Sequence, residues 1–200
     1  MAVAIELVKQ LRELTGAGVK DCRDALEASG GDLEQAAAQL RERGLAAAAK
    51  KSGRETLNGV LDIYSHGDGR VGVMVEVNCE TDFVARTKEF RTFAHEVALQ
   101  VAAASPRWVR PEDVPAEVVE EERAEARRQA QAEGKPAAVI EQIIAGRLDK
   151  FLAETCLLQQ PYIRDEARTL GEMLQEMIAT TGENVTVRRF VRWTVGEEDS

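Results

Sequence analysis

A change in hydrophobic period is the feature that most constrains how this chain can fold. Over residues 1–44, apolar residues recur every three or four positions, as they do on one face of a helix. Over residues 57–79, apolar residues instead alternate with other residues, and Asp68-Gly69 in the middle favours a tight turn between two strands. A chain that contains both short helices and a β-hairpin is predicted to be an α+β protein.

The N-terminal segment, residues 1–44, predicts a compact module of three helices. Two glycine-containing turns separate its three apolar patterns. Asp32 can cap the third helix together with Gln35, and Gly44 is placed to end that helix. The apolar face of the first helix is expected to consist of Leu7, Leu11 and Leu14.

The remaining residues predict a linker and one core domain. Residues 45–56 are alanine-rich and polar and are interrupted by Gly53, which is typical of a linker. We expect a small antiparallel sheet packed with helices, and a helical hairpin that protrudes because its first arm has few apolar residues. The core domain, 57–200, adds to the β-hairpin a helix over 82–104, the helical hairpin over 116–154, a helix over 169–181 and a last strand over 184–195.

Composition and charge exclude several classes of protein. The net charge of −9 argues against direct binding of nucleic acid, which requires a basic surface. No apolar stretch approaches the roughly 20 residues of a membrane span, and the first residues lack the layout of a signal peptide. We therefore expect a cytoplasmic protein with no membrane partner, in which Cys22, Cys79 and Cys156 stay reduced.

Motifs that could hold a nucleotide or a metal are weak. A G-x-G-x-x-G motif occurs at Gly67, Gly69 and Gly72, but it continues into a strand, whereas a dinucleotide site needs a helix there. No histidine or cysteine pair has the spacing of metal ligands, so we expect no metal site and no cofactor. Two alternatives stay open: a thiol enzyme that uses Cys79 with a histidine, His66 or His95, and a generic peptide- or ubiquitin-like-binding module.

The segment after the β-hairpin, Thr81-Asp82-Phe83-Val84, supports two interpretations. Thr81 or Asp82 can cap the helix that begins here. Phe83 precedes Phe90 by seven residues and is in phase with the apolar stripe of that helix, so periodicity alone favours a buried Phe83. A large apolar side chain in the first turn of a helix can also protrude and wedge into a partner.

Four segments in order resemble elongation factor Ts, the guanine nucleotide exchange factor for elongation factor Tu. They are "LTGAGVKDCRDALEASGGDLEQAAAQLRERG" (14–44), "VNCETDFVAR" (77–86), "EGKP" with "IIAGRLDKF" (133–151) and "GENVTVRRF" (182–190). The resemblance extends over nearly the whole chain, and four ordered signatures are far more specific than any one of them.

The resemblance implies how each part would act. The N-terminal bundle is expected to have a ubiquitin-associated-like fold and to dock on the nucleotide-binding domain of Tu. His66, at the tip of the β-hairpin, is a candidate contact. The docking edge is expected to comprise Leu11, Arg12, Thr15, Gly16, Gly18 and Val19, with Val19 in a position where the family usually has Met.

The resemblance also implies an exchange mechanism without bond-making chemistry, so no enzyme activity is expected. Thr81, Asp82, Phe83 and Val84 would dislodge Mg²⁺ from the nucleotide site of Tu and promote the release of GDP. GTP binding would then release the factor.

Short members of the family are expected to work as homodimers. The last strand is the candidate dimer edge, and Arg189 on its expected apolar face predicts a bulge or an exposed edge. Val191 provides no cysteine for a disulfide across a dimer, and Asp149 stands where the family more often has Lys. The apolar face of this strand is expected to comprise Val185, Val187, Val191, Trp193 and Val195.

Overall fold

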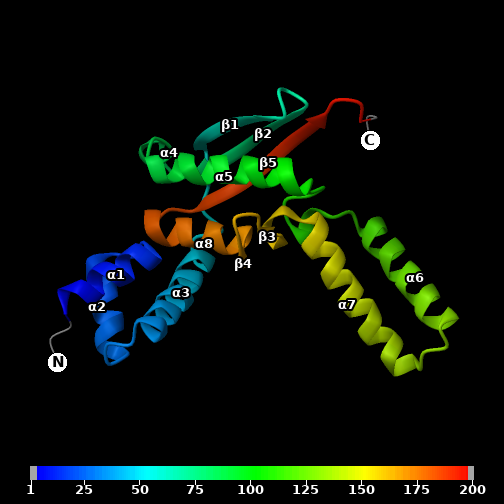
Figure 1. The fold of residues 1–200 in the computed structure, drawn as a ribbon, viewed down its shortest axis with the longest axis horizontal. Coiled ribbons are helices and arrows are strands. Elements are labelled where there is room, and N and C mark those ends of the chain that lie inside the picture. The colour runs from blue at the N-terminus through cyan, green and yellow to red at the C-terminus, as the bar shows by residue number, and fades with distance from the viewer. Residues whose placement is uncertain (1–3, 198–200) are drawn as a thin grey trace. The chain divides into compact units, whose positions relative to one another are not determined.

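The structure, a computed structural model, describes residues 4–197 and confirms the α+β class. Its elements, in chain order, are α1 Ile5–Thr15, α2 Val19–Ala28, α3 Leu33–Ala49, β1 Asn58–His66, β2 Val71–Cys79, α4 Asp82–Ala85, α5 Lys88–Ala104, η1 Pro111–Asp113, α6 Ala116–Ala132, α7 Ala137–Thr155, η2 Leu157–Gln159, β3 Pro161–Tyr162, β4 Asp165–Thr169, α8 Leu170–Thr181 and β5 Val185–Thr194 (Figure 1).

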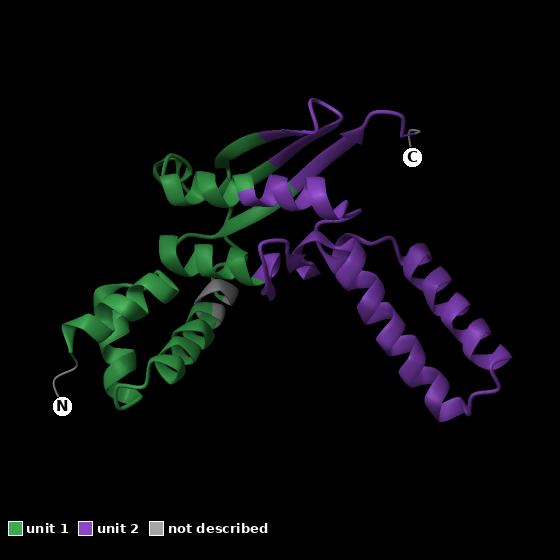
Figure 2. Cartoon of the chain, in the orientation of Figure 1, with its two compact units in different colours: residues 1–62, 76–95, 172–188 green, residues 63–75, 96–171, 189–200 purple. Residues whose placement is uncertain are grey.

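The chain forms two compact units (Figure 2). Unit 1 comprises residues 1–62, 76–95 and 172–188, and unit 2 comprises residues 63–75, 96–171 and 189–200. Strands β1, β2 and β5 and helix α5 each contribute residues to both units. Within the described residues 4–197, no helix is long and apolar enough to cross a membrane.

The three-helix module in unit 1 is confirmed. Helices α1, α2 and α3 enclose a small core of Leu11, Cys22, Ala25, Leu26 and Ala36, all fully buried. Asp32 caps α3 as predicted, because its Oδ1 accepts a hydrogen bond of 2.9 Å from the Gln35 backbone N–H. Leu14, in contrast, is 71% exposed, so its predicted place in the core is wrong.

Helix α3 corrects the predicted end of this module. It does not stop at Gly44 but continues to Ala49. The alanines after Gly44 favour helix, and the glycine serves close packing instead: a Cβ at Gly44 would lie 3.2 Å from the Cβ of Ala179 in α8. The first residues of the expected linker are therefore helical.

The sheet has the strand order β1-β2-β5, so β2 is central and β5 is an edge. The predicted β-hairpin is confirmed. Val73, Val75 and Val77 of β2 are buried, whereas the alternating apolar residues at the start of the hairpin, Leu57, Leu61 and Ile63, are all more than 60% exposed. The inward positions of β1 instead include Asp62, which lies 3.2 Å from His95 Nδ1 in α5.

Strand β5 does not keep one apolar face, so that prediction is wrong. Val185 and Val187 are buried, whereas Trp193 and Val195 are 65% and 70% exposed. Near the end of the strand the inward residue is Arg192, whose Nε donates to the Ala102 carbonyl in α5. The inward side therefore changes between Val187 and Arg192, in the region where the sequence predicts a bulge.

Unit 2 contains the predicted helical hairpin, formed by α6 and α7. Arg147 of α7 pairs with Glu122 of α6 at 3.0 Å, and Arg127 pairs with Glu141 at 3.1 Å. A short β3-β4 ribbon, which the sequence did not predict, follows η2. The core of the hairpin consists of Ala126, Ala130, Ile140 and Ile144, flanked by Ile143 and Leu148.

Candidate functional site

A break in the helix predicted over 82–104 shapes the candidate site. Thr81 caps α4, because its Oγ1 accepts from the Val84 N–H at 3.4 Å. Helix α4 ends at Ala85, and α5 begins only at Lys88. Thr87 lies at the break: its Oγ1 donates to the Val84 carbonyl at 2.8 Å and accepts from the Phe90 N–H at 3.3 Å. The prediction of a single helix over 82–104 is therefore wrong, because a cap at Thr87 separates two helices.

The break decides the position of Phe83. Phe90 is fully buried, but Phe83 is 78% exposed. Since the two residues lie on different helices, their spacing of seven no longer puts them on one stripe, and the burial expected from periodicity is wrong. Leaving a phenylalanine in water forgoes roughly 1.5–3 kcal/mol relative to burying it. Its neighbours Val84 and Ala85, each 6% exposed, are buried and hold α4 in place within unit 1.

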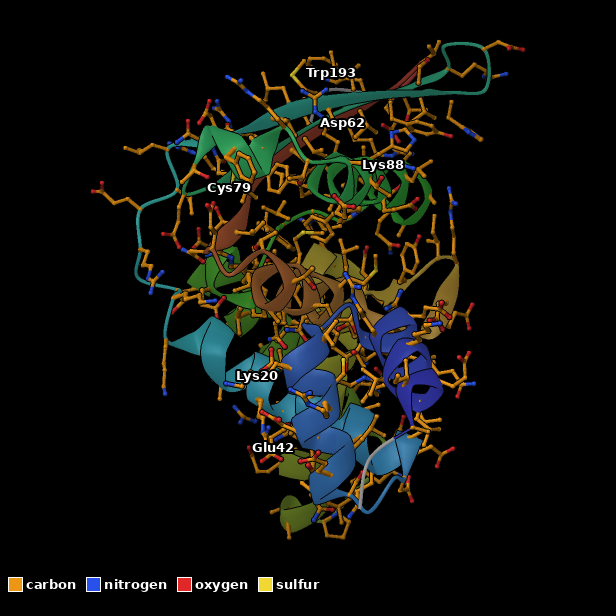
Figure 3. All side chains as sticks on the ribbon, turned by 90° about the vertical axis from the view of Figure 1, so that its left-hand side faces the viewer. Lys20, Glu42, Asp62, Cys79, Lys88 and Trp193 are labelled. Atoms are coloured by element: carbon orange, nitrogen blue, oxygen red, sulfur yellow. The ribbon has the colours of Figure 1, made fainter. Side chains whose placement is uncertain are left out.

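The start of this segment is tied to the sheet through Cys79, the last residue of β2 (Figure 3). Burial raises the pKa of the Cys79 thiol to about 11, with a further contribution from the charge of Glu183. The protonated thiol donates to the Thr81 carbonyl at 3.1 Å. A thiol held in this way is a poor nucleophile. The Nδ1 atom of His66 is hydrogen-bonded to the Tyr64 hydroxyl, and the Nδ1 atom of His95 is hydrogen-bonded to Asp62. These observations disfavour the thiol-enzyme alternative.

Two residues after α8 hold the same segment from the other side. Glu183 accepts hydrogen bonds from the N–H and the hydroxyl of Thr81, at 3.0 and 2.6 Å. The Asn184 N–H donates to Glu80 Oε1 at 2.6 Å, and Arg54 Nη1 lies 3.3 Å from the same oxygen. The Asn184 N–H first, and then Arg54, hold the pKa of Glu80 below its usual value. Sequence reasoning missed Glu183, although it lies within the "GENVTVRRF" signature.

An open groove lies beside the segment in unit 1. It has a volume of about 460 Å³ and is lined by Asp62, Arg86, Lys88, Arg91, Thr92 and His95. Figure 3 shows Lys88 at the start of α5 and Asp62 on β1. Arg86 pairs with Asp82 at 2.8 Å. In a chain with a net charge of −9, this gathering of basic side chains suits an acidic surface of a partner.

The predicted docking edge on the three-helix module is partly corrected. Leu11 is fully buried, so the expectation that it contacts a partner directly is wrong; it supports the edge from within. Thr15 is half-buried, and its hydroxyl donates to the Leu11 carbonyl at 2.7 Å. Leu14, 71% exposed, is a contact candidate that was instead assigned to the core. The other predicted residues are exposed: Arg12, Gly16, Gly18 and Val19.

The structure brings most of the predicted site residues into one unit. The docking edge and the segment Thr81–Val84 both belong to unit 1 (Figure 2). His66 belongs to unit 2, where it is exposed at the end of β1 and its Nδ1 lies 3.0 Å from the Tyr64 hydroxyl. His66 is therefore not grouped with the other predicted residues.

Comparison with known proteins shows the family to which the chain belongs. Residues 30–197 match the family "Elongation factor TS", and residues 6–39 match a UBA-like domain. The chain belongs to the elongation factor Ts family. It is 55% identical to elongation factor Ts of Carboxydothermus hydrogenoformans, over 98% of this chain and 90% of the relative. It is 53% identical to that of Coprothermobacter proteolyticus, over 98% of this chain and 100% of the relative.

Membership of the elongation factor Ts family confirms two expectations. The chain is similar over nearly its whole length to translation elongation factors, and its N-terminal helices match a UBA-like domain. At the level of the family, membership supports a role in nucleotide exchange on elongation factor Tu.

Proposed function

We propose that this protein accelerates GDP release from elongation factor Tu in the cytoplasm by inserting Phe83 next to the nucleotide-bound Mg²⁺ of Tu. The proposal rests on one observation: the side chain of Phe83 is 78% exposed, on a short helix whose N-terminus is capped by Thr81. An aromatic side chain held in water in this way is available to a partner without unfolding any part of the protein.

The proposed mechanism needs no covalent step. Tightly bound GDP depends on Mg²⁺ and on hydrogen-bond donors around its phosphates, and both belong to Tu. An apolar wedge that displaces the metal weakens phosphate binding. Each loss of about 1.4 kcal/mol in nucleotide binding corresponds to a tenfold weaker affinity. Asp82, adjacent to Phe83, pairs with Arg86 at 2.8 Å, and this i,i+4 pair favours the helical turn that carries Phe83.

The same coupling explains release of the factor. If binding of the factor lowers the affinity of Tu for nucleotide, nucleotide must lower the affinity of Tu for the factor by the same ratio. GTP, which is abundant in the cell, then displaces the factor from Tu. One molecule of the factor can therefore serve many molecules of Tu.

Docking is assigned to the exposed edge of the three-helix module. Arg12 supplies charge, Gly16 and Gly18 allow close approach, and Val19 and Leu14 supply apolar area, being 54% and 71% exposed. Thr15 supports this edge through its hydrogen bond to Leu11. Docking brings the factor to Tu, whereas Phe83 acts on the nucleotide site.

We also propose that two copies of the chain associate through the sheet. In unit 2, Ile63, Trp193 and Val195 are 65–70% exposed, and β5 is an edge strand. Exposed apolar side chains of this size on a sheet commonly mark a protein interface. A second copy of the same sheet would cover them.

The test is to measure the release of fluorescent GDP from Tu with and without the protein. Strong acceleration at amounts far below those of Tu is the expected result. Undiminished retention of GDP by a competent Tu that still binds the protein would overturn the proposal, and would favour the binding-module alternative instead.

A further inference from the structure

Glu183 accepts hydrogen bonds from both donors of Thr81, the backbone N–H and the side-chain hydroxyl. Its Oε2 accepts from the Thr81 N–H at 3.0 Å, and its Oε1 accepts from the Thr81 hydroxyl at 2.6 Å. The two residues lie 102 positions apart in the sequence. Hydrogen bonds to an ionised carboxylate are shorter and stronger than those between neutral groups. Thr81 is therefore held in one orientation rather than free to rotate.

Asn184 extends this clamp to the preceding residue. Its N–H donates to Glu80 Oε1 at 2.6 Å, and its side-chain amide donates to the Arg54 carbonyl at 2.8 Å. Asn184 is only 2% exposed, so these bonds are protected from competition by water. Asn58 donates to the Glu80 carbonyl at 2.8 Å. Residues 80 and 81 are thus held at both side chain and backbone.

The clamp controls the direction of Phe83 because α4 is so short. Helix α4 has four residues, and Phe83 is its second. A single turn of helix is not stable by itself, since nucleation costs more than one turn recovers. Its direction therefore depends on the packing of Val84 and Ala85 together with its N-cap, and that cap is Thr81. Phe83 itself, 78% exposed, has little packing to hold it.

The C-terminal end of α8, just before Glu183, also lies against the docking module in unit 1. A Cβ at Gly16 would lie 3.2 Å from Thr180 Oγ1, and a Cβ at Gly44 would lie 3.2 Å from Ala179 Cβ. Two residues after α8 ends at Thr181, Glu183 reaches Thr81. The end of α8 and the residues directly after it therefore contact both the docking module and the cap of the Phe83 helix.

We propose that Glu183 is a positioning residue for nucleotide exchange: through Thr81 it fixes the direction in which Phe83 is presented to the docked partner. This inference rests on the proposed function. It predicts that loss of Glu183 impairs the step that Phe83 performs and leaves docking intact. Glu183 acts through its hydrogen bonds to Thr81.

The experiment measures GDP release from Tu over a range of factor concentrations for Glu183→Ala and Glu183→Gln. The expected result is a saturating release rate lower by roughly tenfold, with the half-saturating concentration changed by less than about twofold. Glu166→Gln is the matched control, because Glu166 is exposed on β4 and its substitution removes the same charge. It should release GDP like the unaltered protein.

One further variant and a second readout guard against a simple folding defect. Thr81→Val loses the hydroxyl that donates to Glu183, so its saturating release rate should fall as that of Glu183→Gln does. Hydrogen exchange of the free protein provides a second readout that does not depend on Tu. In Glu183→Gln, amide protection should fall over residues 80–85 and stay unchanged in the core strand β2.

The double variant Phe83→Ala/Glu183→Ala separates the possible failures. If Glu183 acts through Phe83, the double variant should release GDP no more slowly than Phe83→Ala alone. Additive effects, or full exchange by Glu183→Ala while Phe83→Ala is impaired, would overturn the role of Glu183 and leave the proposed function standing. Normal exchange by Phe83→Ala would overturn the wedge itself, and this inference with it.

Discussion

At the scale of single residues, the contrast between Phe83 and Phe90 carries most of the functional argument. Both are phenylalanines that begin helical segments, yet one is 78% exposed and the other fully buried. The difference comes from Thr87, whose hydroxyl ends one helix and caps the next. A single capping residue therefore turns an apparent core position into an exposed one.

Replacing Phe83 by alanine should impair exchange without harming the fold. We expect the saturating rate of GDP release to fall by about tenfold or more, with a nearly unchanged affinity for Tu and an unchanged melting temperature. Phe90→Ala is the matched comparison: because Phe90 is fully buried, the same change should cost about 3–5 kcal/mol of stability. Unchanged release rates in Phe83→Ala would show that Phe83 is a bystander.

Cys79 should make stability depend on alkaline pH. Its pKa is raised from 9.0 in the unfolded chain to about 11 in the folded protein, chiefly by burial. The folded state thus favours the protonated thiol, so this contribution is complete below about pH 9 and is lost as the pH rises towards 11. Urea unfolding across this range should show a falling free energy of unfolding.

Cys79→Ser is the control for this titration. Serine does not ionise in this range, so the decline in the free energy of unfolding should be shallower; parallel curves would show that Cys79 does not contribute. Burial raises the pKa of Tyr162 from 10.0 to about 12, so its own contribution is lost between about pH 10 and 12; this contribution is common to both proteins and cancels in the comparison. Loss of exchange in Cys79→Ser at neutral pH would revive the thiol-enzyme alternative.

At the scale of elements, the three-helix module presents an edge that differs from the one predicted. Leu14 near the end of α1 and Val19 at the start of α2 are exposed on either side of the turn that joins these helices, whereas Leu11 packs in the core beneath it. Gly16 adopts a positive φ of 65°, which ends α1 and which a side chain would strain. The apolar contact area of this edge therefore lies on either side of a glycine turn.

Changing this edge should weaken docking but not the exchange step. Leu14→Asp and Val19→Asp place charges on exposed positions, so the module should stay folded. We expect the half-saturating factor concentration to rise by roughly tenfold, with little change in the saturating rate of GDP release. Ile5→Asp is the control, because Ile5 is also exposed, at 77%, but lies at the far end of α1. Equal effects of all three substitutions would argue against a localised docking edge.

At the scale of the whole molecule, the exposed apolar residues of the sheet point to association. Ile63 and Trp193 come from the two edge strands, β1 and β5. The inner side of β5 contains buried Val185 and Val187, whereas the inward residues of β1, such as Asp62, are half-buried. A stable sheet with an apolar outer side suits pairing with an identical copy.

Trp193→Glu should shift the protein from dimer to monomer. A charge at the centre of an apolar interface would have to be desolvated on association, which costs several kcal/mol. Sedimentation equilibrium at micromolar concentrations measures the change. Leu57→Glu provides a comparison at a residue that is 79% exposed just before β1. A dimer that persists in Trp193→Glu would exclude β5 as its centre, and a monomer before any substitution would exclude the dimer.

Local patterns were sufficient for much of this fold. The helices of the N-terminal module, the β-hairpin, the helical hairpin and the last strand all appear where the sequence predicts them, because amphipathic period, caps and turn glycines act within a few residues. The hydrogen bond from the Gln35 N–H to the Asp32 side chain follows from the spacing of these two residues. The segment that contains Phe83 was also recognisable from its residues and its resemblance to a known family.

Other features needed the tertiary structure, because they depend on which distant segments meet. Local pattern could not tell that Gly44 serves packing on Ala179, or that β5 changes its inward side before Arg192. Nor could local pattern predict the hydrogen bond between Glu183 and Thr81, because the two residues lie far apart in the sequence. The sequence alone determined most of the elements and the family. Only the tertiary structure decided that Phe83 faces water and what holds its helix, because exposure and long-range hydrogen bonds arise when the elements pack together.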